Sequence, residues 1–324
     1  MKTGKRKGLE ALADKSGVIA ALAIDQRSAL RKLFAAASGW AAEEVPTEWL
    51  VQFKEKVSKI LTPHASAILL DPEYGLPAAR ARDSDAGLLL AYEVSGYDKR
   101  VPGRLPRTIE GKTVQSLKED GADAVKVLLY YSPFSGEAIN AHKQRWVKRV
   151  GVECSAADVP FFLEIVSYRD DMDEKSAEFA KVRPEVVTRS VEEFCKPEYG
   201  VDVLKMGVPV NMKFVESATL PRGQGLYTRE EAVKLFRRAS EAATLPFIYL
   251  SEGVSNEMFV DALNLAAEAG SKFSGVLCGR ATWQDGVPIF VKSGATALEN
   301  WLSEEGVRNI ENVNRHLGVA RPCY

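Results

Sequence analysis

The stretch VDVLKMGVPVN, residues 201–211, is built almost entirely from apolar and small side chains, yet it carries Lys205 near its middle. Continuous apolarity, as opposed to alternation, is typical of a strand covered on both faces, as in parallel sheets flanked by helices. The stretch therefore predicts a buried parallel strand, and it raises the question of why an ammonium group is placed there.

Seven more apolar runs of this kind recur along the chain, and segments with helical periodicity separate them. Thr228 and Glu231, for example, form a capping-box pattern at the start of one helical segment. The candidate strands are 17–25, 66–74, 87–93, 123–131, 160–168, 201–210, 246–253 and 274–282. Eight strands alternating with helices predict an α/β protein with the fold of a single (β/α)8 TIM barrel.

The chain is expected to form one domain over residues 1–324, with an N-terminal helix and a C-terminal helical tail. The alternative is a doubly wound open sheet, but no GxGxxG opens a helix after the first strand. No linker or repeat divides the sequence. Two irregular stretches, 95–108 and 216–227, are predicted to be loops over one face.

Composition and charge exclude several classes of protein. Of the 324 residues, 46% are hydrophobic and 27% are charged, and the formal net charge is −1, so no global field attracts nucleic acid or anionic lipid. Neither a signal peptide nor a membrane span is expected. The four cysteines (Cys154, Cys195, Cys278 and Cys323) form no CxxC pair. These features indicate a soluble cytoplasmic protein with neither nucleic acid nor membrane as a partner.

In a barrel of this kind the carboxyl ends of the strands carry the chemistry, so polar residues near those ends are candidates for the active site. They come from seven of the eight predicted strands. They are Asp25, Gln26, Arg27, Asp71, Glu73, Lys126, Glu164, Lys205, Ser251, Glu252, Gly253, Gly279 and Arg280.

Lys205 has the strongest chemical implication. Alternation places it on one face with Gly207, and an inward-facing Glu164 in the preceding strand would share its chamber. Burial and the nearby Lys126 would lower the pKa of Lys205, whereas a carboxylate would raise it, so the net direction stays open. A neutral amine attacks a ketone to form a Schiff base.

Each of these residues also has a structural alternative. Lys205 could snorkel from an edge or pair with Glu164 for structural reasons alone, although a second lysine and a glutamate sunk in apolar runs disfavour this. Asp25 could cap the following helix, and Ser251 could be a turn residue. Arg280 follows Gly279 after the eighth strand, where barrel enzymes often bind phosphate.

Other catalytic classes lack their residues. The three histidines, His64, His142 and His316, have no metal-binding spacing, so no metal cofactor is expected. A serine or cysteine triad lacks a histidine near a strand end, and an NAD enzyme lacks its fingerprint. Covalent chemistry through a lysine remains.

Eight motifs give the sequence a resemblance to a known family. They are ALAIDQR, LLDPEYGLPAA, GLLLAYE, GADAVKVLLYY, PFFLEIVSY, VLKMGVPVNMK, IYLSEGVS and GVLCGRATW. Together they resemble tagatose 1,6-bisphosphate (diphosphate) aldolase, a class I bacterial aldolase of lactose and galactose catabolism. The resemblance implies a (β/α)8 barrel that cleaves a ketohexose 1,6-bisphosphate without metal. Its products would be dihydroxyacetone phosphate and glyceraldehyde 3-phosphate, and several epimeric sugars could serve as substrates.

The resemblance also implies roles for individual residues. Lys205 matches the Schiff-base lysine, and Glu164 matches the glutamate that moves protons. Lys126, Asp25 and Gln26 match pocket residues. The cradle for the phosphate at C1 matches Ser251, Gly253, Gly279 and Arg280. A homo-oligomer, dimer or tetramer, is expected because helices on such barrels commonly pair across subunits.

One position departs from the family pattern. Gly207 stands where the family is expected to carry a glutamate, which predicts a larger chamber and a more neutral amine. This leaves two alternatives open: an aldolase for 6-deoxy-6-sulfofructose 1-phosphate, and a regulatory pseudo-aldolase that binds sugar phosphates. A scaffold barrel with a structural Lys–Glu pair is a third, and it predicts no imine trapping.

Overall fold

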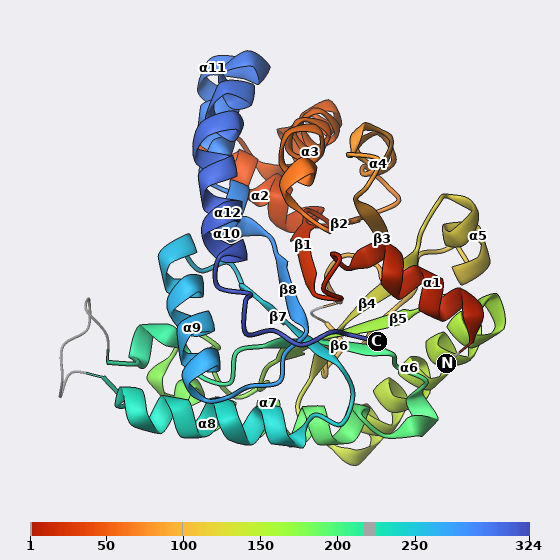
Figure 1. Ribbon diagram of the computed structural model, residues 1–324, viewed down its shortest axis with the longest axis vertical. Helices are drawn as coiled ribbons and strands as arrows, with labels where there is room; N and C mark the ends of the chain where they lie inside the picture. The colour runs from red at the N-terminus through yellow and green to blue at the C-terminus, as the bar shows by residue number, and fades with distance from the viewer. Residues whose placement is uncertain (1, 99, 217–224) are drawn as a thin grey trace.

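Eight parallel strands close into a barrel in the order of the sequence (Figure 1). The computed structural model describes residues 2–98, 100–216 and 225–324. The strands are β1 Ile19–Ala23, β2 Ala67–Leu70, β3 Gly87–Ala91, β4 Ala124–Tyr131, β5 Phe161–Ser167, β6 Val203–Gly207, β7 Phe247–Leu250 and β8 Gly275–Cys278. Because β8 pairs with β1, the open-sheet alternative is wrong and the predicted barrel is confirmed.

Helices surround the barrel and connect its strands. They are α1 Thr3–Leu12, α2 Ser28–Ser38, α3 Thr47–Leu61, α4 Leu76–Ala81, α5 Val114–Glu119, α6 Glu137–Ala157, α7 Ala177–Phe194, α8 Arg229–Ala242, α9 Asn256–Glu268, α10 Arg280–Trp283, α11 Gly286–Trp301 and α12 Val307–Asn314. Shorter elements are the 3₁₀ helices η1 Ala42–Glu44, η2 Thr62–His64, η3 Pro197–Tyr199 and η4 Met212–Phe214, and the π-helix η5 Leu302–Gly306. The predicted capping box is present at the start of α8, with Thr228 as the N-cap and Glu231 in the first turn.

Two layers of apolar side chains hold the barrel together. Inward-facing residues of alternate positions fill its interior, among them Ala124, Phe162 and Val203. Outward-facing residues of the same strands pack against the helices, which explains why the strands read as continuous apolar runs. Leu9 and Leu12 of α1 join the inner layer. Helix α1 therefore covers the amino-terminal end of the barrel and leaves the carboxyl ends of the strands for the site.

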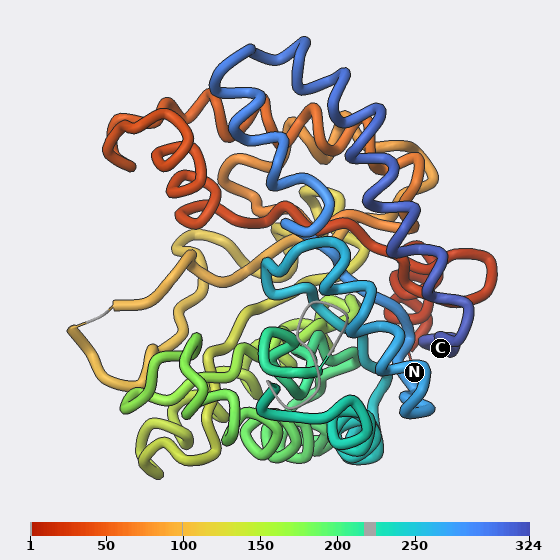
Figure 2. Tube along the Cα trace, turned by 90° about the vertical axis from the view of Figure 1, so that its left-hand side faces the viewer, coloured from red at the N-terminus to blue at the C-terminus, as the bar shows by residue number. Residues whose placement is uncertain are grey.

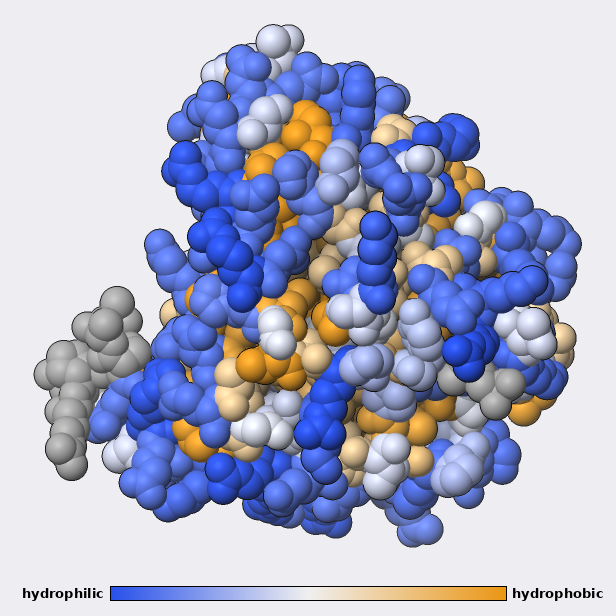
Figure 3. All heavy atoms as spheres, viewed as in Figure 1, coloured by the Kyte–Doolittle hydropathy of each residue, from blue (hydrophilic) through white to orange (hydrophobic). Residues whose placement is uncertain are grey.

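The two ends of the chain lie close together, as Figures 1 and 2 show from two directions. The guanidinium carbon of Arg6, in α1, lies 5.8 Å from the ring centre of Tyr324. On the face shown in Figure 3, hydrophilic residues predominate and apolar ones form small patches between them. Among the described residues, no helix combines the length and the apolarity needed to cross a membrane.

The two predicted loops differ in how far the structure describes them. The loop 95–108, in which residue 99 is outside the described residues, brings Arg104 and Arg107 to a cleft at the carboxyl end of the barrel. Most of the stretch 216–227 falls on residues 217–224, which lie outside the described residues. The prediction about that second loop is therefore not tested.

Candidate active site

Two charged side chains from neighbouring strands meet inside the barrel. The register of β5 and β6 pairs Glu164 with Lys205, each two positions beyond an inward-facing apolar residue. Lys205 Nζ lies 2.9 Å from Glu164 Oε2, and the two residues are 3% and 5% exposed. The prediction of a shared chamber is confirmed. A lysine snorkelling from an edge is excluded, whereas the Lys–Glu ion pair weighed as an alternative is present.

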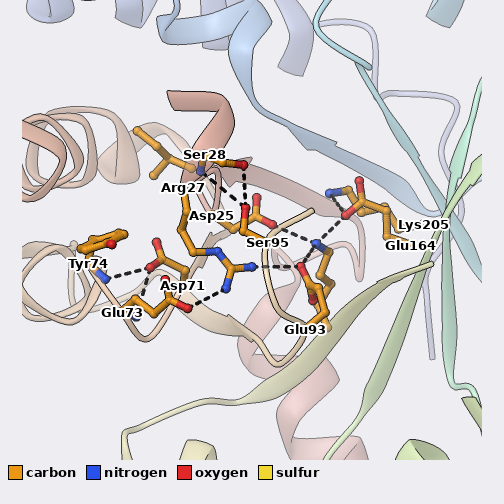
Figure 4. Close-up of polar contacts among 12 residues, drawn as sticks. Asp25, Arg27, Ser28, Asp71, Glu73, Tyr74, Glu93, Ser95, Glu164 and Lys205 are labelled. Atoms are coloured by element: carbon orange, nitrogen blue, oxygen red, sulfur yellow. Dashed lines mark hydrogen bonds and ion pairs between the residues drawn. The ribbon is translucent and has the colours of Figure 1, made fainter. Parts of the chain in front are cut away.

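A second lysine, Lys126 of β4, lies on the same carboxylate. Its Nζ is 2.7 Å from Glu164 Oε2, 2.8 Å from Asp25 Oδ2 and 3.0 Å from Glu93 Oε1, and the residue is fully buried. Figure 4 shows Asp25 and Glu93 on one side of this cluster, with Glu164 and Lys205 on the other. Glu164 Oε2 is thus shared by two lysines.

The charged groups of the cluster strongly shift one another's pKa values. Burial alone would lower the pKa of Lys126, but the carboxylates of Asp25, Glu164 and Glu93 raise that pKa well above its ordinary value. Burial would likewise raise the pKa values of Asp25 and Glu164. The ammonium groups of Lys126 and Lys205 outweigh this and hold both pKa values below the ordinary range. Lys126 is therefore a fixed cation, and both acids are carboxylates at neutral pH.

Further ion pairs adjoin the cluster of Lys126, Glu164 and Lys205. Arg27 lies between two carboxylates, with Nη1 3.3 Å from Glu73 Oε1 and Nη2 3.5 Å from Glu93 Oε1. Deeper still, the fully buried Lys54 of α3 pairs with Asp71 after β2 and donates to the Ile24 carbonyl at 2.7 Å. This second hydrogen bond fixes the backbone directly before Asp25.

Asp25 does not cap the next helix. Helix α2 begins at Ser28, its N-cap is Arg27, and no side chain accepts a hydrogen bond from its first turn. The Asp25 carboxylate accepts from Lys126 instead. The interpretation of Asp25 as a helix cap is wrong because a buried ammonium binds a carboxylate more strongly than an exposed backbone amide does.

A cleft of about 990 Å³ opens above this cluster, and Asp25, Gln26 and Glu164 line it. Gln26 Oε1 is buried and has no hydrogen-bond partner among the described residues. Buried polar atoms are normally paired, so this acceptor is suited to a donor on a bound molecule. A volume of this size holds a small organic ligand.

The loops after β7 and β8 form one wall of the cleft, to which Ser251, Gly253 and Arg280 contribute. Arg280 donates to the Glu252 carbonyl at 3.2 Å. Gly253 has φ +80°, a conformation that favours glycine, and a Cβ there would meet the Arg280 guanidinium. Gly279 directly precedes α10, and it lies close in space to the side chain of Gln26. Ser251, Gly253 and Arg280 thus line the same cleft, and Gly279 directly precedes Arg280. The Ser251 carbonyl also accepts from the Val254 N–H at 3.1 Å, so the interpretation of Ser251 as a turn residue holds as well.

Gly207 does not enlarge the chamber. A Cβ placed on Gly207 would fall inside the contact distance of Glu252 Oε1, so the Glu252 carboxylate already fills this space. That carboxylate is also ion-paired with Arg183 of α7. The prediction of a larger chamber is wrong because a side chain from the end of β7 occupies the place that Gly207 leaves.

The described part of the chain, residues 2–98, 100–216 and 225–324, contains no group of three or more histidine, cysteine, aspartate or glutamate side chains arranged to hold a metal ion. His64, in η2, lies 3.2 Å from Glu311 Oε1 and is remote from the cleft.

Comparison with known proteins identifies the family of this chain. The sequence profile of the DeoC/LacD family aldolases matches residues 19–285. The chain belongs to this family. Family members are aldolases, that is, carbon–carbon lyases. "Tagatose 1,6-diphosphate aldolase 2" of Enterococcus faecalis is 52% identical over 99% of this chain and 96% of its own length. "Tagatose 1,6-diphosphate aldolase" of Staphylococcus aureus is 48% identical over 97% and 95%.

Solved structures share the family's fold. A fructose-bisphosphate aldolase from Plasmodium falciparum superposes with a TM-score of 0.65 at 14% identity, over 95% of this chain and 93% of that one. An archaeal fructose-1,6-bisphosphate aldolase, captured with its catalytic lysine bound to a carbinolamine intermediate, gives a TM-score of 0.55 at 16% identity, over 90% and 98%. At these identities the likeness bears on the barrel alone.

Sequence reasoning missed three residues of the site. Glu93 ends the third apolar run as Asp25 ends the first, so the rule applied to other strands would have found it. Arg183 lies on a helix and Arg104 in a long loop, and neither interrupts an apolar strand. No signal in the sequence marks those two arginines.

Proposed function

We propose that this protein is a Schiff-base aldolase that cleaves D-tagatose 1,6-bisphosphate to dihydroxyacetone phosphate and glyceraldehyde 3-phosphate. The observation that carries the proposal is the pair Lys205–Glu164 at 2.9 Å, with the fixed cation Lys126 on the same oxygen. The substrate comes from the names of relatives about 50% identical over nearly the whole chain. Epimeric ketohexose bisphosphates are further expected substrates.

Lys205 is the nucleophile. Its ammonium passes a proton to Glu164, and the neutral amine attacks the C2 ketone to form a carbinolamine. Glu164 returns that proton to the departing hydroxyl, so that loss of water gives a protonated imine and restores the carboxylate. This imine accepts the electron pair released when C3–C4 breaks. Glu164 takes the proton of the C4 hydroxyl, which releases glyceraldehyde 3-phosphate and leaves an enamine. Protonation at C3 and hydrolysis then release dihydroxyacetone phosphate and restore the amine.

The surrounding residues have supporting roles in this proposal. Lys126 keeps Glu164 ionised, since it lowers the pKa of that carboxyl group, so that Glu164 can act as a base. Asp25 orients Lys126, and the unpaired Gln26 Oε1 accepts from a substrate hydroxyl. Arg280, with the backbone of Ser251, Gly253 and Gly279, holds the C1 phosphate and so aligns the reacting carbon.

The mechanism uses no metal ion and no cofactor, so EDTA should leave the rate unchanged. A homo-oligomer and a cytoplasmic location remain predictions. Sedimentation of the purified chain would test the first, and fractionation of the host cell would test the second.

Borohydride trapping tests the proposal. Borohydride reduction of the protein in the presence of dihydroxyacetone phosphate should attach this ligand irreversibly to Lys205, as mapped by peptide mass spectrometry. Lys205→Met should abolish both the adduct and turnover while circular dichroism stays unchanged. Lys213→Met, at a lysine that lines the cleft, is the control and should keep the adduct. An adduct on a different lysine, or none, would refute the assignment. A panel of tagatose, fructose and sulfofructose phosphates then ranks the substrates.

A further inference from the structure

Glu252 combines several unusual features at the wall of the cleft. It follows β7 between the two cradle residues Ser251 and Gly253, and its backbone has φ +52°. Residues other than glycine, asparagine and aspartate rarely adopt this left-handed conformation because it costs free energy. A glutamate held there indicates that its side chain does something that a glycine could not.

The Glu252 side chain fills the space over Gly207. Strands β6 and β7 pair Gly207 with Leu250, which brings the end of β7 beside the face that carries Lys205. Gly207 itself has no positive φ, so its backbone would accept a side chain. A Cβ at Gly207 would lie 2.2 Å from Glu252 Oε1 and 2.8 Å from Arg183 Nη2, so the Glu252 carboxylate is the nearest obstacle and its partner Arg183 is the next. Gly207 and Glu252 are therefore a matched pair, in which one residue leaves the room that the other occupies.

The same carboxylate neutralises a buried cation. Arg183 of α7 is 7% exposed, lines the cleft, and donates from Nε and Nη2 to the Val208 carbonyl at 3.0 and 2.8 Å. Its Nη2 also donates to Glu252 Oε2. Arg280, on the same wall, forms no ion pair within the part of the chain that the structure describes, and its Nη2 reaches only the Glu252 carbonyl. The wall thus holds two arginines, and a carboxylate neutralises one of them.

We propose that Glu252 is a specificity-determining residue: it masks Arg183 over Gly207, so that a phosphate of the substrate is directed to Arg280. An arginine fork binds phosphate and carboxylate with the same geometry, so an unmasked Arg183 would compete for the anion. A phosphate at Arg183 would draw the sugar toward α7 and away from the carbon position that Lys205 must reach. The identity of the ligand as a sugar phosphate rests on the proposed function. The masking of Arg183 by Glu252 does not, because it can be measured by anion binding without turnover.

Inorganic phosphate is the probe for masking. Isothermal titration should show that Glu252→Gln, which keeps the volume and removes the charge, tightens phosphate binding about tenfold, or about 1.4 kcal/mol. The double variant with Arg183→Met should return binding to the wild-type value. The control Glu268→Gln removes a carboxylate that pairs with Arg229, and since neither residue lines the cleft it should leave phosphate binding unchanged. Unchanged binding in Glu252→Gln, or tightening that persists without Arg183, would overturn the proposal.

The matched pair has a test that needs no ligand. Gly207→Ala should lower the midpoint of thermal unfolding, because its Cβ collides with the Glu252 carboxylate. In a Glu252→Ala background, where that carboxylate is absent, the same change should cost less than half as much. Equal losses in both backgrounds would show that Glu252 does not fill this space. If borohydride trapping fails while the phosphate titration and the Gly207→Ala comparison give the expected results, the aldolase mechanism is wrong and the masking of Arg183 by Glu252 stands. If trapping succeeds and these two tests fail, only the masking proposal is wrong.

Discussion

Replacing Lys126 with methionine should destabilise the protein in a way that depends on pH. Methionine has nearly the length of lysine but no charge, so Asp25, Glu93 and Glu164 would lose their common cation in a site where Lys126 is fully buried. Removing one partner of a buried ion pair costs about 3–5 kcal/mol. The folded variant can limit this cost by binding a proton. For a carboxyl group of ordinary pKa, about 4, protonation at pH 7.5 costs about 5 kcal/mol.

The direction of the pH effect follows from the pKa shifts. In the wild type, Asp25 and Glu164 have folded-state pKa values below those of the unfolded chain. Their stabilisation is complete above the unfolded pKa and is lost as the pH falls through the folded pKa. In Lys126→Met the folded-state pKa of at least one carboxyl rises above its unfolded value, so stability is lost as the pH rises. Between pH 5.5 and 7.5 the deficit relative to wild type should grow, by at most about 2.7 kcal/mol for each proton bound.

Urea unfolding of both proteins at pH 5.5 and 7.5 measures this difference. Lys234→Met is the control, because Lys234 forms a solvent-exposed pair with Glu230 on α8 and its loss should leave the midpoint unchanged at both pH values. A deficit for Lys126→Met that is the same at pH 5.5 and 7.5 would show that no carboxyl takes up a proton. The charge balance described for the cluster would then be wrong.

Three other substitutions test separate parts of the structure. Glu164→Gln should lower kcat about 10²- to 10⁴-fold because the amide cannot accept a proton, while KM changes little; steady-state kinetics separates the two constants, and an unchanged kcat would remove Glu164 from the mechanism. Arg280→Ala should raise KM for the bisphosphate far more than it lowers kcat, and a loss confined to kcat would contradict its role as the phosphate anchor. Gly151→Ala, in α6, should destabilise the protein by about 1–3 kcal/mol, since its Cβ would collide with the Tyr199 carbonyl in η3; an unfolding midpoint at the wild-type value would contradict that close approach.

The fold could be predicted because strands covered on both faces leave a strong signal. Runs such as 123–131 and 201–210 contain few polar residues, and any charge within them is conspicuous. Lys126, Glu164 and Lys205 were found for this reason, and the register of β4, β5 and β6 brings them together. Their functional roles stay predictions. The sequence predicts that the side chains of Lys126, Glu164 and Lys205 are buried and close to one another.

The relation between Gly207 and Glu252 could not be predicted in this way. Each residue is unremarkable in its own segment, and the two become neighbours only when β6 pairs with β7. A missing side chain at Gly207 was therefore interpreted as empty space. The contribution of Arg183 was hidden for a related reason, since a charged residue on an amphipathic helix normally faces solvent. Contacts between side chains from different elements are the part of a site that a single sequence does not contain.

The charge balance of the cluster bears on the proposed chemistry itself. Lys205 and Lys126 share Glu164 Oε2, but Lys126 contacts two more carboxylates, whereas Glu164 is the only ion-pair partner of Lys205 among the described residues. In the proposed reaction the ammonium of Lys205 becomes a neutral amine and then a protonated imine, which carries the same charge as the ammonium. The buried carboxylates that oppose the neutral amine therefore favour the imine once it has formed. The proposed mechanism fits this division, since it gives Lys126, with three carboxylates, a constant charge and assigns the covalent chemistry to Lys205, which has one.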